Sequence, residues 1–253
     1  MTTAALMDDT VEFRAEELAQ PLRVIACAAR TDTGTRRRVN EDALLVAPPL
    51  LAVADGVGGR PAGEAASALA LDVLRREVRP RAGEHELAAA LRTANGAIRA
   101  AGHEISRTGM ATTVVLALVG AGGIAVAHVG SRAYLVSDGR LTQLTVDHSL
   151  VSALVAVGGL SAADARRHPL SPVIVRALGL GGDVAPDIAS HPARPGDLLL
   201  LCSDGLSDGL ASAAIERSAA GTTDVDRLVT DLAAAARAGG SGDDITVIAA
   251  RLG

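Results

Sequence analysis

Aromatic side chains are almost absent from this chain of 253 residues, which has one Phe, one Tyr and no Trp. Proteins that bind single-stranded nucleic acid stack its bases on aromatic rings, and nucleic-acid-binding proteins in general present an excess of basic side chains. This chain has neither feature, since its formal net charge is −5. We therefore expect no nucleic acid among its partners.

Cysteine and long apolar runs are also scarce. Cys27 and Cys202 lie in apolar, strand-like segments, and we interpret them as buried thiols of a reducing compartment rather than as a disulfide. The longest apolar region, residues 114–129, is interrupted by glycines and contains His128, so it predicts a strand hairpin and not a membrane span. The acidic N-terminus does not match a signal peptide. The sequence thus predicts a cytoplasmic protein without a membrane span.

What the chain has in abundance is aliphatic side chains, because hydrophobic residues make up 49% of it. This content is sufficient for one large core. Residues 1–20 are acidic and weakly patterned, and we interpret them as a mobile extension before a single domain at 21–253. Short apolar runs indicate strands at 22–29, 50–54, 113–119, 124–129, 133–136, 141–145, 198–202 and 245–252. Apolar residues at helical spacing indicate helices at 66–74, 87–105, 211–219 and 225–237, and an interrupted one at 149–167. Because strands are grouped with strands and helices with helices along the chain, the sequence predicts the α+β class.

One predicted strand ends in an acid and a glycine-rich turn. Residues 50–54 are aliphatic, Asp55 follows them, and the next residues include Gly56. A carboxylate at the end of a buried strand is costly unless it is paired. The glycines allow the backbone to approach a ligand and present a carbonyl to it. This stretch is therefore a candidate site.

The same pattern recurs far along the chain. Asp204 follows the apolar run 198–202, and Asp243 and Asp244 stand just before the strand at 245–252. Such strands can bring their acids to one edge of a folded sheet. Carboxylates that lie so close need a cation, and oxygen ligands without His or Cys favour Mg²⁺ or Mn²⁺ over Zn²⁺. The sequence therefore predicts a divalent-metal site.

Simpler interpretations exist for each of these residues. A single Asp often caps a helix or stabilises a turn. The arginines beside Glu41 and Asp42 fit a solvated surface, although their position next to the Asp55 strand also suits phosphate binding. His128, His148 and His168 are tempting as general acids, but a lone His is more often structural.

Taken in order, the motifs resemble those of the metal-dependent PP2C family of serine/threonine phosphatases, in particular its compact bacterial members. The resemblance covers about residues 22–252. Its most specific motifs are Arg37-x-x-Asn40-Glu41-Asp42, Val53-Ala54-Asp55-Gly56-Val57-Gly58-Gly59, Cys202-Ser203-Asp204-Gly205-Leu206 and Asp243-Asp244-Ile245-Thr246-Val247. Further matches lie at 31–34, 109–113, 128–132, 144–149 and 176–179.

The resemblance implies an antiparallel β-sandwich flanked on both sides by helices, with two Mn²⁺ or Mg²⁺ ions at one edge. By motif position, Asp55 bridges the ions, the Gly56 carbonyl binds the second, and Asp204 and Asp243 hold the first. The acidic pair Glu41 and Asp42 acts near the second ion through water, and Arg37 binds the phosphoryl group. In this chemistry a metal-activated water attacks phosphorus directly, and the sequence contains no Cys-x5-Arg motif of the covalent phosphatases.

The chain departs from the family pattern in three places. Bacterial members usually have Gly-Asp-Ser-Arg where this chain has Gly130-Ser131-Arg132. The Asp that helps to hold a third metal is therefore missing, and we expect this third site to be weak or absent. Ala111 replaces a usual Gly, and Pro172 replaces a usual Asn; both substitutions concern local loop geometry.

Two classes of function follow. The first is an active phosphatase, expected to be a monomer, that acts on phosphorylated Ser/Thr proteins, including a Ser/Thr kinase. A narrower form of this function is the removal of phosphate from one regulatory partner, such as an anti-sigma antagonist. The second is a regulatory or binding module with decayed catalysis. Retention of Asp55, Asp204 and Asp243 favours the enzyme, because a pure binding module has no need for a costly cluster of acids.

Overall fold

The computed structural model of the chain describes residues 21–57, 62–103, 109–120, 122–165, 168–170 and 173–253. The predicted mobile extension at residues 1–20 lies outside the described residues, as do the glycines that follow Val57 and Pro172. Within the described part, no helix is long and apolar enough to cross a bilayer.

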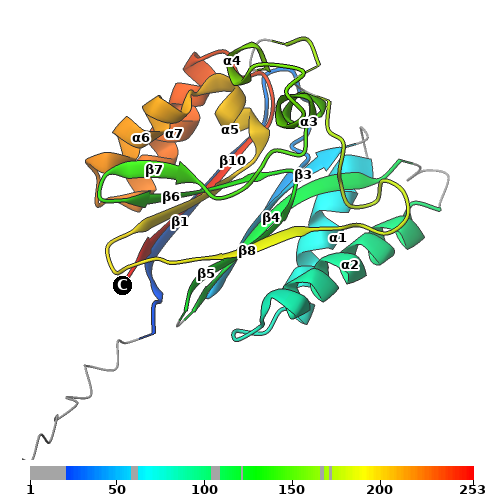
Figure 1. Cartoon of the computed structure of the whole chain (residues 1–253), viewed down its shortest axis with the longest axis horizontal. Coiled ribbons are helices and arrows are strands. Elements are labelled where there is room, and N and C mark those ends of the chain that lie inside the picture. The colour runs from blue at the N-terminus through cyan, green and yellow to red at the C-terminus, as the bar shows by residue number, and fades with distance from the viewer. Residues whose placement is uncertain (1–20, 58–61, 104–108, 121, 166–167, 171–172) are drawn as a thin grey trace, which may run out of the picture.

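The described strands form two antiparallel sheets of five strands each, packed face to face (Figure 1). One sheet consists, in spatial order, of β1 (Val24–Asp32), β10 (Ile245–Leu252), β9 (Leu198–Cys202), β6 (Arg132–Ser137) and β7 (Arg140–Gln143). The other consists of β2 (Asp42–Ala47), β3 (Leu50–Val57), β4 (Ala111–Gly120), β5 (Gly123–Val129) and β8 (Asp187–His191).

Helices cover the outer face of each sheet. The second sheet carries α1 (Ala62–Glu77) and α2 (Glu84–Ala101), and the first carries α5 (Asp204–Gly209), α6 (Ser212–Ala220) and α7 (Val225–Ala238). Two short helices, α3 (Leu150–Ala156) and α4 (Ala162–Ala165), lie together at one end of the sandwich (Figure 1). This arrangement confirms the predicted α+β sandwich with helices on both sides, including the interruption of the helix expected at 149–167.

The alternation of side chains along β3 explains both its apolar sequence and the direction of its terminal acid. Ala52 and Ala54 pack against the outer helices, whereas Leu51 and Val53 pack between the two sheets. A strand that is buried on both faces reads as a continuous apolar run. Because side chains alternate with period two, Asp55 points to the same side as Val53, toward the other sheet.

Glycine allows α5 to pack directly on α7. A Cβ atom on Gly209 would lie 2.1 Å from the Ala236 carbonyl oxygen, and this neighbour is backbone and cannot rotate away. By contrast, Gly96 in α2 is exposed and has no heavy atom within 4 Å of its Cβ position. The two glycines are a matched pair for testing this packing.

We expect Gly209→Ala to lower the free energy of unfolding by roughly 1–3 kcal/mol, because the methyl group forces α5 from α7. Gly96→Ala should raise it by about 0.5–1 kcal/mol, because alanine is the better helix former and meets no clash. Urea denaturation of both variants with saturating Mn²⁺ measures the difference. Equal stability of the two variants would contradict the close approach of α5 to α7.

Candidate metal centre

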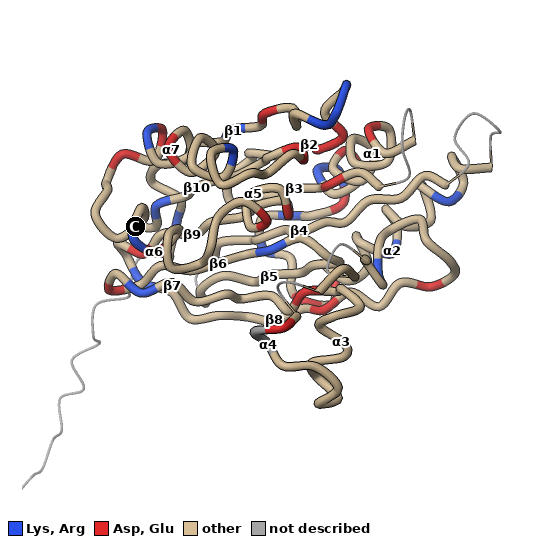
Figure 2. The backbone as a smooth tube through the Cα atoms, turned by 90° about the horizontal axis from the view of Figure 1, so that it is seen from above, with Lys and Arg blue, Asp and Glu red and all other residues tan. Residues whose placement is uncertain are grey.

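The site begins with two acids that face each other across neighbouring strands. Asp42 and Asp55 are directly paired in the register between β2 and β3, so their side chains lie on the same face. Asp42 Oδ2 accepts a hydrogen bond of 2.8 Å from Ser203 Oγ. That contact joins the two sheets, since Ser203 follows β9. Figure 2 shows acidic positions of β2 and β3 and of α5 in this region.

Asp204 reaches the same place from the other sheet. It is the first residue of α5, directly after the end of β9 and Ser203. Its carboxyl group is within hydrogen-bonding reach of the Asp55 carboxyl group. The two acids stand 149 positions apart in the sequence (204 − 55), and the sandwich brings them together as the strand pattern predicted.

These carboxyl groups are desolvated and repel one another. Burial, followed by the charges of Asp204 and Asp42, raises the pKa of Asp55 well above its usual range. Burial likewise raises the pKa of Asp204, and it raises that of Asp42 to about 7. Asp42 Oδ1 and Asp204 Oδ1 are buried and have no hydrogen-bond partner within the described structure. Oxygen atoms of this kind fit a hard divalent cation.

Asp243 occupies the rim of the cluster and is paired with Arg37. Arg37 Nε and Nη2 donate to the two carboxylate oxygens of Asp243 at 2.6 and 2.8 Å. Burial alone would raise the pKa of Asp243, but the hydrogen bonds from Arg37 and the Asp244 amide lower it. Arg37, the predicted phosphate ligand, and Asp243, a predicted metal ligand, thus neutralise each other in this structure.

The neighbouring Asp244 has a structural role. It is 3% exposed, and its carboxylate accepts hydrogen bonds from the backbone amides of Gly34 at 2.7 Å and Glu41 at 2.9 Å. These contacts fix the loop that carries Arg37 beside β10. Asp243 therefore lies in the site, and Asp244 stabilises the loop beside it.

Glu41 and Gly56 are held tightly beside Asp55. The Glu41 carbonyl accepts hydrogen bonds from Gly56 N at 3.1 Å and from Ser67 Oγ at 2.7 Å. The Glu41 side chain is buried, and its Oε2 lies 3.5 Å from Arg37 Nη1. A Cβ atom on Gly56 would lie 2.4 Å from the Gly63 carbonyl oxygen, so only glycine fits there.

Sequence reasoning missed Asp208. It lies one helical turn after Asp204 on α5, and its pKa is raised to about 6 by burial and by the charge of Asp204. Together with Asp55 and Asp204 it lines a cavity of about 700 Å³ that extends beneath α3. The spacing of four residues between Asp204 and Asp208 was the signal, since it places both acids on one helix face.

The hairpin that lacks the family's acid carries no carboxylate in the structure. Ser131 Oγ lies 2.6 Å from Thr113 Oγ1. Arg132 forms a two-pronged ion pair with Asp147, with Nε donating to Oδ1 at 2.7 Å and Nη2 donating to Oδ2. The turn between β5 and β6 is therefore surrounded by the hydroxyl groups of Ser131 and Thr113 and by Asp147, an acid from outside the hairpin that is paired with Arg132.

The family model for protein phosphatase 2C matches residues 35–241, which include Arg37, Asp55 and Asp204. The chain belongs to the protein phosphatase 2C family. Solved structures of PP2C relatives have the same two-sheet sandwich fold.

Among curated proteins, the chain is 39% identical over 238 residues to the serine/threonine protein phosphatase PstP of Mycobacterium tuberculosis, covering 92% of this chain and 46% of PstP. It is 35% identical over 233 residues to the serine/threonine phosphatase stp of Listeria monocytogenes, covering 87% and 92% of the two chains. The chain thus spans about half the length of PstP and nearly all of stp.

Among solved structures, the M. tuberculosis phosphatase PstP/Ppp has a TM-score of 0.85 at 38% identity and covers 91% of this chain and 98% of its own. The catalytic domain of PstP in complex with two manganese ions has a TM-score of 0.82 at 37% identity and covers 91% and 99%. Fold and family are therefore the same, and a relative holds manganese.

The metal-free cluster predicts an unusual dependence of stability on pH. Because the folded-state pKa of Asp42 is about 7, the folded protein retains a proton that the unfolded chain has already lost. The free energy of unfolding of EDTA-treated protein should therefore fall by roughly 1–3 kcal/mol between about pH 5 and about pH 8. Denaturant titrations across this range measure the slope.

Two controls separate this effect from general titration. Asp42→Asn should remove much of the slope, because the amide has no proton to lose. Saturating Mn²⁺ should stabilise the protein more at the higher pH, because the ion binds the deprotonated carboxylates. Stability that stays constant or rises over the same range without metal would contradict the raised pKa values.

Proposed function

We propose that the chain is a metal-dependent phosphatase that hydrolyses phosphoserine and phosphothreonine in proteins. The observation that carries this proposal is that Asp42, Asp55 and Asp204 lie together in the described structure. Two of their buried carboxyl oxygens, Asp42 Oδ1 and Asp204 Oδ1, have no hydrogen-bond partner there. Family membership supplies the chemistry that suits such a cluster. The orphaned oxygens also speak against the alternative of a regulatory module, because a binding module gains nothing from uncompensated acids.

We assign two ions, Mn²⁺ or Mg²⁺, to the cluster. Asp55 would lie between them, Asp204 and Asp243 would hold the first, and the Gly56 carbonyl would hold the second. Glu41 and Asp42 would act on the second ion through water. When bound, such ions lower the pKa of a water molecule and polarise the phosphoryl group. Because no acid stands between Gly130 and Ser131, we propose that a third metal site is weak or absent.

Arg37 provides the group that this chain contributes to phosphate binding. Its planar guanidinium already pairs with both oxygens of Asp243, and the same fork suits two phosphoryl oxygens. With Asp243 held by a cation, Arg37 would be free to orient the phosphoryl group. The buried Asp244 keeps the loop in place during this exchange through its hydrogen bonds to Gly34 and Glu41.

Substrates and setting follow from this proposal. Phosphorylated Ser/Thr proteins, among them a Ser/Thr kinase, are the partners that we propose, and a monomer in the cytoplasm is the proposed state. The cavity beneath α3 joins the acids to apolar side chains that include Val151, Val155 and Leu210. It could receive substrate residues that flank the phosphorylated one.

We expect Asp55→Asn to reduce the rate of phosphothreonine-peptide hydrolysis at saturating Mn²⁺ by at least about 100-fold, since it removes the charge shared by both ions. Asp72→Asn, which changes an exposed acid of α1 that pairs with Arg75, should leave the rate unchanged. Phosphate release with EDTA as a further control measures both. A rate preserved in Asp55→Asn would refute the proposed centre, and an inactive wild type that binds the peptide would favour the regulatory module.

We expect Arg37→Ala to lower kcat/KM for the peptide by about 10- to 100-fold, because a bidentate phosphate contact is lost. The same variant should bind Mn²⁺ as tightly as the wild type or more tightly, because Asp243 loses its competing cation. Arg38→Ala, one position along and exposed, is the matched control. Steady-state kinetics and Mn²⁺ titration test the pair, and identical behaviour of the two variants would rule out the assigned role.

A further inference from the structure

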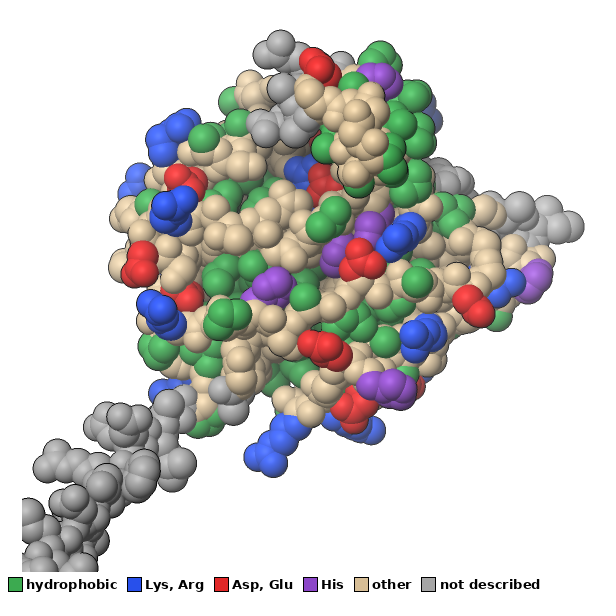
Figure 3. Space-filling view, viewed as in Figure 1, with side chains coloured by type: hydrophobic (Ala, Val, Ile, Leu, Met, Phe, Trp, Pro, Cys, Tyr) green, Lys and Arg blue, Asp and Glu red, His purple; other side chains and the backbone are tan. Residues whose placement is uncertain are grey.

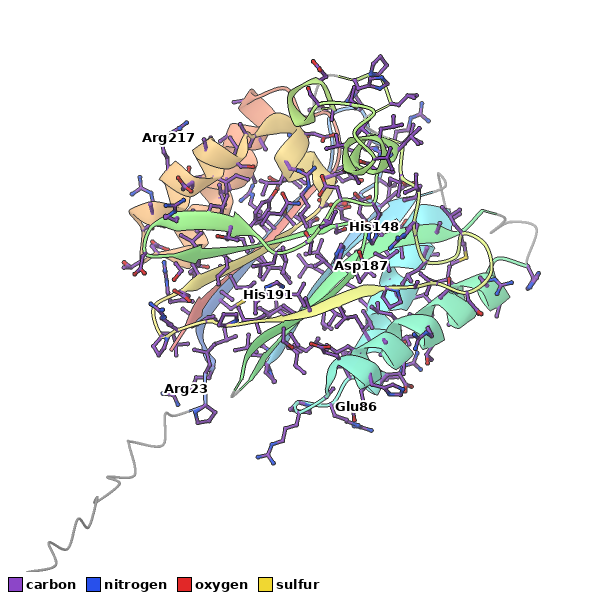
Figure 4. The ribbon with its side chains drawn as sticks, viewed as in Figure 1. Arg23, Glu86, His148, Asp187, His191 and Arg217 are labelled. Atoms are coloured by element: carbon purple, nitrogen blue, oxygen red, sulfur yellow. The ribbon has the colours of Figure 1, made fainter. Side chains whose placement is uncertain are left out.

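A second group of metal-ligating side chains lies outside the acid cluster. It consists of His128 near the end of β5, His148 just before α3, and Asp187 at the start of β8. In Figure 4 the labelled His148 and Asp187 lie next to each other between α3 and β8. Figure 3 shows histidines gathered beside an acidic and a basic side chain on this face.

The geometry of this group is fixed by the fold. His128 and Asp187 are directly paired in the register of β5 and β8. The rings of His128 and His148 are stacked, with centroids 4.7 Å apart and planes inclined by 17°. His148 Nε2 lies 2.9 Å from Asp187 Oδ2. One ligand atom from each residue lies within 4.8 Å of the other two, which is close enough for the three side chains to share one ion after their rings and carboxylate rotate.

Both imidazoles are buried and incompletely partnered. His128 is 4% and His148 is 7% exposed, and Nδ1 of each ring has no hydrogen-bond partner in the described structure. Burial, then the proximity of His148, lowers the pKa of His128 to about 4. His128 is therefore neutral near pH 7, which is the form that binds metals.

A cation already occupies the open side of the group. Arg176 Nη1 donates to Asp187 Oδ1 at 2.9 Å and lies 3.3 Å from His148 Nε2. The side chains of Arg176 and Asp187 are 46% and 48% exposed, so the guanidinium can leave toward solvent. The position thus combines an anionic oxygen, two nitrogen ligands and a removable positive charge.

We propose that His128, His148 and Asp187 form a site for a borderline divalent cation of the Zn²⁺ type, which binds in place of the Arg176 guanidinium. Two imidazoles and one carboxylate are a typical ligand set for Zn²⁺, with water at the fourth position. The same set disfavours Mg²⁺ and Mn²⁺, which prefer oxygen. The two metal sites of the chain therefore differ in chemistry, and this one does not depend on the proposed phosphatase activity.

An ion at this site would tie three segments together. His148 directly precedes Ser149, the N-cap of α3, and its carbonyl accepts a hydrogen bond from Val175 N at 2.9 Å. Asp187 lies on β8, the edge strand of the second sheet, and His128 lies on the adjacent strand β5. Because α3 lines the cavity that contains Asp55 and Asp204, the ion would hold the wall of this cavity against the sheet.

Zn²⁺ binding to the full chain in excess Mg²⁺, measured by calorimetry, tests the proposal, because Mg²⁺ fills the acid cluster and leaves the histidine site open. We expect one tightly bound Zn²⁺ per chain. His128→Ala and Asp187→Asn should each weaken this binding at least about tenfold, and Arg176→Gln should strengthen it. His191→Ala is the matched control, since His191 lies on the same strand as Asp187 and should have no effect.

Co²⁺ in place of Zn²⁺ supplies an independent signal. Its visible absorption should report nitrogen ligation in the wild type and in His191→Ala, and it should be lost in His128→Ala. Asp187→Asn changes an exposed residue, so a folded variant is available even if His128→Ala fails to fold. Absence of Zn²⁺ binding in excess Mg²⁺, or binding that is unchanged in Asp187→Asn and Arg176→Gln, would overturn the proposal and leave an ion-pair network only.

Discussion

The repulsion among Asp42, Asp55 and Asp204 is the constraint on which the rest of this structure depends. The three carboxyl groups come from both sheets and meet where solvent is largely excluded. Hydrogen bonds around them help to keep them in place despite this cost. Ser203 ties Asp42 across the sheets, and Asp244 anchors the loop that carries Arg37. The fold therefore holds three buried carboxyl groups close together, where a cation can take the place of their protons.

Arginine side chains pair with several of the acids that surround the centre of the site. All the basic side chains of this chain other than His are arginines, and three of them form close pairs with acids around the site. Arg37 pairs with Asp243, Arg132 with Asp147 and Arg176 with Asp187. Within the described residues, no arginine donates a hydrogen bond to Asp55, Asp204 or Asp42. A cation at Asp243 or Asp187 would therefore have to displace an arginine, whereas no arginine hydrogen bond competes for the central acids of the described structure.

The sequence predicted the centre of the site better than its surroundings, for a physical reason. The alternation of side chains and the end of an apolar run determine where Asp55 points, and the same local logic applies to Asp204. The pairing of Arg37 with Asp243 joins positions 206 residues apart, and no local pattern specifies it. The stacking of His128 on His148 likewise depends on how a loop returns to the sheet. The short helix α5 and Asp208 were missed because a helix of this length has little periodicity to detect.

The contrast between the two clusters follows from the same physics. Around Asp55 the ligands are oxygens with raised pKa values, so a cation must compete with protons as well as with Arg37. Around Asp187 the carboxylate is half exposed; burial acts to raise its pKa, but His148 and Arg176 lower it overall, and burial lowers the pKa of the His128 ring. The oxygen ligands of the first cluster favour a hard ion, whereas the imidazole nitrogens of the second favour a softer ion. The two clusters would therefore select different cations, through their dielectric surroundings and through the ligand atoms that the strands present.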